Sequence, residues 1–305
     1  MTLHTFRKAS VTGTSVRTDA GGDSFPSSPC VSSFRKSAFL TFFRICRKLL
    51  RDQAQRQHFR DTKQRDNCTA YIGGAIESAL IQDVPLEVLV INDCSKDNLD
   101  KFMLRYRDDP RVRYFKNERR LGVAKTRNRG VAMARGEYIA FLDADDLWTK
   151  DKLKRQLQLM QEKNAVLCST ARELMNPDGT LTGYVIPVKT EFTFSDIRTQ
   201  NQINCSSAVL RADVAREFPM HHDDSHEDYL MWLEVLKKYN YGCAINEPLL
   251  KYRISTTGKS GHKWKSAKMT YRTYRYMGFG FFRSLLYFIC YAFHGVRKYF
   301  FWFLR

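Results

Sequence analysis

The stretch GEYIAFLDADDLW, residues 136–148, decides the fold because it joins an apolar strand directly to a group of carboxylates. Residues 138–142 (YIAFL) have no polar face, which is typical of a strand that is buried on both sides. Such strands belong to sheets that helices cover on both faces. The stretch therefore predicts an α/β fold in which one strand ends in acids.

Asp143, Asp145 and Asp146 follow this strand within four positions, and negative charges so close together repel one another. A hard divalent cation relieves that repulsion, and Mg²⁺ or Mn²⁺ prefers oxygen ligands of this kind. For Asp143 and Asp145 we therefore predict a site for Mn²⁺ or Mg²⁺. For Asp146 a second interpretation stays open, namely a solvated loop in which the aspartate caps the N-terminus of a helix.

Further strands and helices alternate on the N-terminal side of this stretch. Apolar residues at helical spacing predict helices over 72–80 and 123–134, and short apolar runs predict strands over 87–91 and 112–115. This alternation indicates a Rossmann-like, mostly parallel central sheet with helices on both faces. Ligands of such sheets bind at the carboxyl ends of the strands, where the acids lie.

Three more side chains point to that edge of the sheet. Asp93 follows the strand VLVIN directly and Asp97 comes four residues later, although aspartates are also common in turns. Arg127 lies on the small-residue face of its predicted helix, and a buried guanidinium needs an anionic partner. A phosphate, a strand-end aspartate or a structural salt bridge would each serve. We expect these side chains to converge with Asp143 and Asp145.

The chain is basic, with 50 Lys and Arg against 32 Asp and Glu, but the excess lies at its ends. Residues 1–66 carry a net charge of +8 and residues 251–305 carry +12, whereas residues 67–250 carry −2. Cationic ends around a near-neutral body fit contact with an anionic membrane surface. A nucleic-acid partner is therefore not expected.

The eight cysteines are scattered, without a C-x-x-C pair or the His spacing of a zinc site. Several lie in apolar runs and are interpreted as small core residues, which favours a reducing compartment. The first residues lack an apolar stretch before a small-residue cleavage site, so no signal peptide is expected. These features together predict a cytoplasmic protein.

Seven segments in a fixed order resemble the family-2 glycosyltransferases with the GT-A fold, over roughly residues 67–260. Their order and spacing are similar to those of bacterial enzymes that build capsule, lipopolysaccharide or teichuronic-type glycans. The resemblance implies a nucleotide-sugar donor, with a UDP-sugar favoured, and a lipid-linked or cell-surface glycan acceptor. The segments are NCTAYIGGAIESAL, VLVINDCSKDN, NERRLGVAKTRNRG, GEYIAFLDADDLWTKDKL, NQINCSSAVLR, HEDYLMWLEVL and EPLLKYRIS.

The resemblance also implies roles for individual residues in binding the nucleotide sugar. Asp93 matches the acid that contacts the nucleotide base, with Asp97 as a second candidate. Arg127 matches an arginine near the donor nucleotide and its diphosphate. Asp143 and Asp145 match the D-x-D pair, in which Asp145 is expected to be the direct ligand of Mn²⁺ or Mg²⁺.

Asp228, in the segment HHDDSHED (residues 221–228), matches the catalytic base. The reaction implied is one in-line displacement in which Asp228 takes the proton of an acceptor hydroxyl and the anomeric carbon inverts. From the residues alone, a first-turn acid that complements the helix dipole is the alternative. The whole segment also permits a metal cluster, although contiguous His and Asp are usually exposed. Tyr252, Arg253 and Ser260 are expected near the diphosphate.

Residues 1–66 depart from the family pattern, because these enzymes normally begin with a buried strand and none is evident before Asn67. They are expected to form a basic, largely disordered extension with an amphipathic helix over 34–51. An upstream frameshift or misassigned start is one explanation, and a native extension that replaces the strand is the other. Residues 67–255 are expected to form the GT-A catalytic domain without its usual first strand.

Residues 256–305 are expected to form a basic aromatic helical tail that lies on a membrane. Residues 271–305 contain 15 Phe, Tyr and Trp interleaved with Arg and Lys, as in helices of a membrane interface. A bilayer-spanning helix needs about 20 apolar residues, and the run SLLYFICYAFHGV is shorter. We predict peripheral attachment to the inner face of the cytoplasmic membrane. A helical hairpin that covers the core is the alternative.

Other functions stay open at this point. A catalytically weakened, membrane-associated scaffold of the same fold would explain the missing strand. A nucleotidyltransferase would also use strand-end acids with Mg²⁺, but it releases diphosphate instead of a nucleoside diphosphate. A single-strand nucleic-acid-binding module is the third alternative, because aromatic and basic side chains are interleaved in the tail.

Overall fold

The structure, a computed structural model, describes four parts of the chain: residues 39–40, 69–95, 97–254 and 263–303. These parts belong to one compact unit, Arg35–Arg305. The predicted extension over 1–66 therefore lies outside the described residues except for Phe39–Leu40, and so does Ser260.

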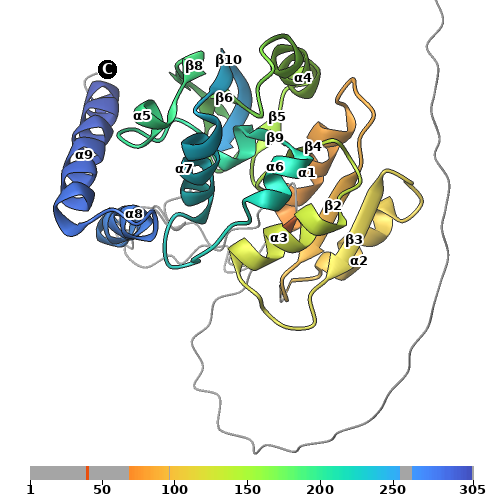
Figure 1. Ribbon diagram of the computed structural model, residues 1–305. Coiled ribbons are helices and arrows are strands. Elements are labelled where there is room, and N and C mark those ends of the chain that lie inside the picture. Colours follow the sequence, from red (N-terminus) through yellow and green to blue (C-terminus); the bar gives the residue numbers. More distant parts are fainter. Residues whose placement is uncertain (1–38, 41–68, 96, 255–262, 304–305) are drawn as a thin grey trace, which may run out of the picture. The chain divides into compact units, whose positions relative to one another are not determined.

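Strands and helices alternate along the described chain (Figure 1). The strands are β1 (Phe39–Leu40), β2 (Val88–Asn92), β3 (Val112–Lys116), β4 (Tyr138–Ala140), β5 (Leu147–Trp148), β6 (Leu167–Met175), β7 (Leu181–Ile186), β8 (Glu191–Phe192), β9 (Val209–Arg211) and β10 (Gly242–Arg253). The α-helices are α1 (Thr69–Leu80), α2 (Leu99–Met103), α3 (Val123–Met133), α4 (Lys152–Glu162), α5 (Phe194–Ile197), α6 (Ala212–Glu217), α7 (Glu227–Tyr239), α8 (Lys263–Tyr276) and α9 (Phe281–Phe303). Two short 3₁₀ helices are η1 (Leu104–Tyr106) and η2 (Cys205–Ser207).

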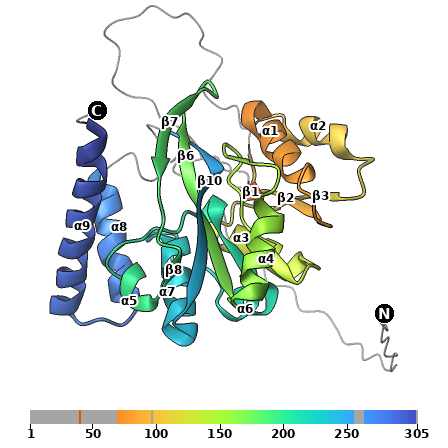
Figure 2. The same cartoon turned by 90° about the horizontal axis from the view of Figure 1, so that it is seen from above.

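The described strands form two ladders. One has the order β1-β2-β3, and the other has β4-β9-β6-β10-β5 with β7 paired to β6 and β8 paired to β10. In Figure 2, β6, β7 and β10 lie side by side at the centre of the second ladder. The α/β fold class with a central sheet and covering helices is thus confirmed.

The sheet is more mixed than the sequence indicated. Parallel pairing joins β2 to β3 and β6 to β10, whereas the other described pairs are antiparallel. The prediction of a mostly parallel sheet is therefore wrong for the described strands. One physical reason is the tight turn between β6 and β7, in which Asn176 N donates to Thr180 O over 2.8 Å and Gly179 has φ +95°. A connection this short can only join antiparallel strands.

The predicted helices around the acidic strand are confirmed. In α1 the stripe Ile72, Ala75, Ile76 and Ala79 is buried, and the helix packs against β2 and β5. In α3 the small residues of one face are buried as expected, and Gly130 lies among them. Burial of these faces drives the packing, because each large apolar side chain that is fully removed from water, such as an isoleucine, stabilises the fold by about 1.5–3 kcal/mol.

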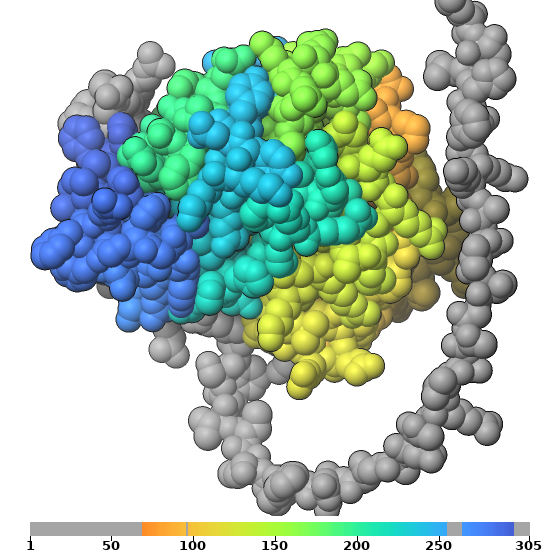
Figure 3. Space-filling model, viewed as in Figure 1, coloured from red at the N-terminus to blue at the C-terminus, as the bar shows by residue number. Residues whose placement is uncertain are grey.

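Helices α8 and α9 pack against each other beside α5 and α7, and Figure 3 shows them gathered at one side of the surface. Tyr274 is fully buried and its hydroxyl lies 3.1 Å from that of Tyr229 in α7, so α8 covers part of the core. The outward face of α9 exposes apolar side chains to solvent. Its exposed large apolar residues are Phe281, Phe282, Leu285, Leu286, Ile289 and Phe293.

No described helix combines the length and the apolar content that crossing a bilayer requires. The amphipathic helix predicted over 34–51 is wrong at the two residues that the structure describes there, because Phe39–Leu40 pair with Ile91 and Val90 of β2 as a strand. The remainder of that predicted helix lies outside the described residues.

Candidate active site

A carboxylate cluster follows β4, as the sequence predicted. One oxygen each of Asp143, Asp145 and Asp146 lies within 4.8 Å of the other two, and within the described chain these residues form the group suited to a metal ion. The loop that carries them runs from the end of β4 to β5, and Ser206 of η2 is hydrogen-bonded to it. The Ser206 hydroxyl accepts from Asp143 N over 2.9 Å and donates to Asp146 Oδ2 over 2.6 Å.

Asp146 is the buried member of the cluster. Its Oδ1 accepts from the backbone N of Arg253 over 2.9 Å, so the carboxyl ties the loop to the end of β10. Burial, together with the charges of Asp145 and Asp143, raises the pKa of Asp146 well above its ordinary value. The physical cause is repulsion in a site that water reaches poorly, and a cation would relieve it. The helix-cap interpretation of Asp146 is wrong, because the residue precedes β5 and no helix begins there.

The cluster fits a hard divalent cation by its chemistry. All of its side-chain donors are carboxylate oxygens, which Mn²⁺ and Mg²⁺ prefer over nitrogen or sulfur ligands. Asp143 is 9% exposed and Asp145 is half-buried, so Asp145 is the member of the cluster that solvent reaches most readily. The residues present therefore suit the metal that the sequence predicted.

Arg127 lies beside the cluster at the centre of an ion-pair network. Its side chain is 1% exposed, and Nη2 donates to Asp143 Oδ1 over 2.9 Å while Nη1 lies 3.3 Å from Glu227 Oε1. Nη1 also contacts the sulfur of Met220 at 3.7 Å. A buried guanidinium between two carboxylates fixes α3, the metal loop and α7 relative to one another. Of the anionic partners predicted for Arg127, the strand-end aspartate is present as Asp143.

Asp93 is fully buried at the end of β2, and its contacts are with the chain itself. Oδ1 accepts from Asn117 Nδ2 over 2.8 Å and from Leu121 N over 2.7 Å, and Oδ2 accepts from Gly122 N over 2.9 Å. The carboxylate thereby orders the loop that leads into α3. Contact of Asp93 with a nucleotide base stays a prediction, and the structure adds this loop-holding role.

Asp97 lies on the half-buried turn after β2, where its carboxylate accepts from the Ser95 hydroxyl. This turn is stabilised further by Asn92, whose side-chain oxygen accepts from Ser95 N over 2.7 Å. The contact agrees with the local turn chemistry that aspartates often supply. A second role for Asp97 in nucleotide binding stays a prediction.

Asp228 lies in the first turn of α7 and is half-buried. Its charge acts on the buried thiol of Cys205, as do the charges of Asp143 and Glu227. Burial and these three carboxylates raise the pKa of that thiol, whereas Arg127 lowers it. An acid in this position also complements the positive end of the helix dipole. The helix itself is held by a broad buried face that includes Trp232.

The segment before α7 joins the site in a way that the sequence did not indicate. Asp223 Oδ1 accepts from Ala124 N over 2.8 Å, so this loop caps the N-terminus of α3. Gly122 precedes the helix at φ +90°, and a Cβ there would meet Asp223 Oδ2 at 2.0 Å. The alternative of a metal cluster within HHDDSHED gains no support, because among the described residues the group that could hold a metal ion is Asp143, Asp145 and Asp146. Exposed His222 instead stacks on the ring of Tyr276 at 3.7 Å.

Arg253, the last residue of β10, contacts the loop that carries the carboxylate cluster. Its Nε donates to Asp145 O over 2.8 Å, and its Nη1 donates to Asn176 O over 3.0 Å. Its guanidinium also lies over the ring of Tyr71 at 4.4 Å. The neighbouring Tyr252 has its pKa raised by burial and by the charge of Asp146. Both residues therefore lie at the cluster, and their contact with a diphosphate stays a prediction.

Two residues that build the site were missed from the sequence. Glu227 is 2% exposed and pairs with Arg127, yet the resemblance to the family pointed only to its neighbour Asp228. Ser206 bonds two members of the cluster, and nothing marks one serine in NQINCSSAVLR. The available signal for Glu227 was its place on a buried face of α7, which Leu230 and Met231 share at i+3 and i+4.

Comparisons with known proteins agree with this geometry. The model of the family described as Glycosyl transferase family 2 matches residues 66–216. TuaG of Bacillus subtilis (strain 168), a glycosyltransferase assigned to teichuronic acid biosynthesis, is 32% identical over 235 residues, which cover 76% of this chain and 93% of TuaG. WfgD of Escherichia coli, named as a UDP-Glc:alpha-D-GlcNAc-diphosphoundecaprenol beta-1,3-glucosyltransferase, is 33% identical over 207 residues, 66% of this chain and 79% of WfgD.

Among solved structures, S. aureus TarS 1-349 in complex with UDP-GlcNAc superimposes with a TM-score of 0.55 at 20% identity. The match covers 68% of this chain and 62% of that structure, and at this identity it supports the fold alone. The fold is thus GT-A, as the resemblance implied. The identity to TuaG over nearly its whole length shows the family directly. The chain belongs to glycosyl transferase family 2.

Proposed function

We propose that this glycosyltransferase moves a sugar from a nucleotide-sugar donor, a UDP-sugar, to a hydroxyl of a lipid-linked or cell-surface glycan acceptor, with inversion at the anomeric carbon. The names of two relatives support the class of product and acceptor. TuaG is assigned to teichuronic acid biosynthesis, and WfgD is named for glucosyl transfer from UDP-Glc to a diphosphoundecaprenol-linked sugar. The TarS structure holds UDP-GlcNAc, which supports a donor of that class.

The observation that carries the proposal is the carboxylate cluster at the end of β4 with Arg127 beside it. A nucleoside diphosphate carries its charge on the two phosphates, and a metal ion that bridges to them needs oxygen ligands on the protein. Asp145 and Asp143 supply such ligands at the partly exposed side of the cluster. Mn²⁺ or Mg²⁺ bound there would offset the charge that grows on the departing diphosphate.

The residues of the chain then divide the work of the reaction. Asp228 takes the proton of the acceptor hydroxyl as its oxygen attacks the anomeric carbon from the side opposite the diphosphate. Arg127 keeps Asp143 in place and adds positive charge at the donor side of the site. Asp93 orders the loop that leads into α3, and Asp97 shapes the turn after β2, on which the nucleotide base is proposed to rest.

The C-terminal helices support attachment of the enzyme to an anionic membrane surface. The outward face of α9 exposes Phe282, which is 83% exposed, and Ile289, which is 56% exposed, on one side of a helix whose segment has no acidic residue. A helix with such a face binds at the boundary between headgroups and acyl chains, helped by anionic lipid. Attachment at the inner face of the cytoplasmic membrane would hold the enzyme in the plane of a lipid-linked acceptor.

A panel of nucleotide sugars tests the proposal, with the full chain assayed in Mn²⁺ and in EDTA. The expected result is metal-dependent release of a nucleoside diphosphate, with UDP-sugars giving the highest rate. Release of diphosphate alone would instead indicate a nucleotidyltransferase. Binding without turnover, in the presence of an acceptor lipid, would indicate a catalytically weakened scaffold.

A further inference from the structure

Four basic residues are buried in the described part of the chain, and in three of them the cost of burial is offset. Arg127 pairs with two carboxylates. Burial lowers the pKa of Lys152 to about 7, so this amine can lose its charge. Arg253 donates to three backbone carbonyls. The fourth is Arg172 of β6, whose surroundings are different.

Arg172 is 8% exposed and has no anionic partner in the chain. Among the residues that the structure describes, no carboxylate lies within ion-pair distance of its guanidinium. Nη1 lies 3.5 Å from Gln202 O, which is long for a hydrogen bond, and Nε is buried without a partner. Arginine does not lose its proton in proteins, so its charge stays. An unpaired charge in this position destabilises the fold unless a ligand supplies the anion.

The position of Arg172 is at the edge of the sheet where the carboxylate cluster lies. Strand β9 pairs antiparallel with both β4 and β6, and β6 pairs parallel with β10. The carboxyl ends of β4, β6 and β10 therefore lie at one edge. The cluster follows β4, Arg253 ends β10, and Arg172 comes three residues before the end of β6.

Two neighbours of Arg172 connect it to the cluster. Its guanidinium lies over the ring of Tyr252, with Cζ 5.8 Å from the ring centroid. Burial and the three carboxylates of the cluster raise the pKa of Tyr252, whereas the charge of Arg172 lowers it, so both groups act on one hydroxyl. The second neighbour is Gln202, which precedes η2 and hence Ser206, the residue that is hydrogen-bonded to two members of the cluster.

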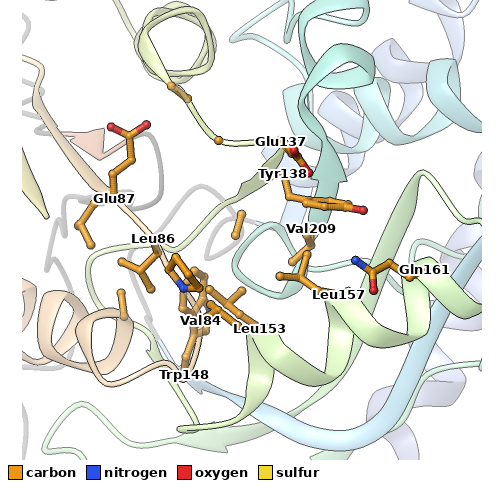
Figure 4. A pocket seen from close by; sticks show the side chains of 16 residues that line it. Val84, Leu86, Glu87, Glu137, Tyr138, Trp148, Leu153, Leu157, Gln161 and Val209 are labelled. Atoms are coloured by element: carbon orange, nitrogen blue, oxygen red, sulfur yellow. The ribbon is translucent and has the colours of Figure 1, made fainter. Parts of the chain in front are cut away.

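The cavity in Figure 4 does not suit an anion. It has a volume of about 520 Å³ and lies beside the first residues of β2 and β4, where these strands begin. Its lining is mainly apolar, and the charged residues in it, Glu87 and Glu137, are both acidic. Because these carboxylates repel an oxyanion, the edge that holds Arg172 is the better place for one.

We propose that Arg172 binds a diphosphate group of a substrate at the carboxyl edge of the sheet. A guanidinium presents paired N–H donors that match two oxygens of a phosphate, and such charge-assisted pairs are stronger than neutral hydrogen bonds. This inference rests on the proposed function, which brings two sources of the group to the site. The nucleotide-sugar donor carries a diphosphate, and so does an acceptor of the kind named for WfgD.

A binding role for Arg172 predicts the sign of its effect on stability. Arg172→Met removes a buried charge that has no partner and keeps most of the aliphatic stem, so the protein no longer bears the cost of desolvating that charge. Urea denaturation of the full chain is therefore expected to give a midpoint at least as high as that of the wild type. A lower midpoint would assign Arg172 to the support of the fold and overturn the proposal.

Calorimetry with inorganic pyrophosphate in excess Mg²⁺ tests binding on the full chain and needs no turnover. Arg172→Met is expected to weaken pyrophosphate binding at least tenfold, because a charge-assisted pair is lost. Arg198→Met is the matched control and should bind like the wild type. Arg198 also has a buried Nε without a partner, but its guanidinium lies over the rings of Phe194 in α5 and Tyr287 in α9. Equal affinities of wild type and Arg172→Met would overturn the proposal.

Saturating UDP distinguishes the two sources of the diphosphate. If Arg172 binds the donor, UDP displaces pyrophosphate from the wild type, and Arg172→Met also weakens UDP binding. If Arg172 binds the acceptor, pyrophosphate still binds to the UDP-saturated wild type and binds at least tenfold more weakly to Arg172→Met. Either result supports the proposal, whereas a wild type that does not bind pyrophosphate would overturn it. A failure of the proposed function is recognised separately, as binding without release of a nucleoside diphosphate in the transfer assay.

Discussion

Arg127 and Asp143 form a buried ion pair in which Nη2 donates to Oδ1 over 2.9 Å and the arginine side chain is 1% exposed. The same guanidinium reaches Glu227 on α7, so three parts of the site share one positive charge. Burial removes these charges from water, and the cost is offset only while all partners stay in place. The pair therefore both builds the fold and prepares the metal loop.

Removal of that charge is expected to destabilise the protein strongly. Arg127→Met leaves Asp143 and Glu227 buried without their shared partner, which typically costs about 3–5 kcal/mol. Arg155→Met is the control, because Arg155 pairs with Glu247 at the surface, where such pairs contribute about 0–1 kcal/mol. Chemical denaturation measures both variants. Similar losses of unfolding free energy in the two would contradict the network.

Asp228→Asn is expected to lower kcat by about a hundredfold or more while the Kd for the donor stays within a factor of about three, since loss of a general base typically costs 10²–10⁴-fold. The reason is that the amide keeps the size of the side chain but cannot take the acceptor proton. Asp224→Asn, in the exposed loop before α7, should leave kcat near the wild-type value. Equal losses of turnover and donor binding in Asp228→Asn would indicate a structural role.

Lys152 is expected to make stability depend on pH. It is fully buried, its Nζ donates to Gln156 Oε1 over 2.7 Å, and burial lowers its pKa from 10.5 to about 7. Between these two pH values the unfolded chain holds more protons than the folded one, so stability rises with pH by up to about 1.4 kcal/mol per unit. This gain in stability is complete above pH 10.5, the pKa of the lysine in the unfolded chain, and it is lost as the pH falls through about 7, its pKa in the folded chain.

The variant Lys152→Met is therefore expected to flatten the rise of unfolding free energy between pH 7 and pH 10. Lys154→Met, which removes an exposed lysine that pairs with Asp83, is the matched control and should keep the wild-type slope. Urea denaturation across this pH range measures both. An unchanged slope in Lys152→Met would mean that the buried amine is not the group responsible.

The apolar face of α9 predicts binding to anionic lipid. The double variant Phe282→Ser/Ile289→Ser is expected to reduce sedimentation with phosphatidylglycerol vesicles at least tenfold, because it removes two side chains that water otherwise surrounds. Leu104→Ser/Leu181→Ser removes two exposed leucines elsewhere and should sediment like the wild type. Sedimentation that is equal for all three proteins would exclude α9 as the attachment site.

Local signals in the sequence carried much of the fold and part of the site. The apolar run before Asp143 predicted β4 and the acids at its end, and the burial of Arg127 followed from its place on a small-residue face. Periodicity is strong in these segments because both faces of the strand and one face of the helix are buried. The GT-A architecture could be recognised because these segments also follow one another in the family's order.

What the sequence left open depends on contacts between distant segments. The partnership of Arg127 with Glu227 joins residues 100 positions apart, and Ser206 reaches back to Asp143 across 63 positions. The direction of strand pairing was misjudged for the same reason, since the antiparallel pairing of neighbours such as β6 and β9 is set by packing. Likewise, the burial of Asp93 beneath its own loop follows from hydrogen bonds to Leu121 and Gly122 that no local pattern indicates.

The central claim is that a divalent cation at Asp143 and Asp145 joins the protein to the diphosphate of the donor, and UDP binding measured by calorimetry tests it most directly. With Mn²⁺ present, the wild-type chain is expected to bind UDP at least tenfold more tightly than in EDTA. Asp145→Ala should lose that difference while its melting temperature stays near the wild-type value. Equal affinity with and without Mn²⁺ in the wild type, or full metal dependence in Asp145→Ala, would contradict the account.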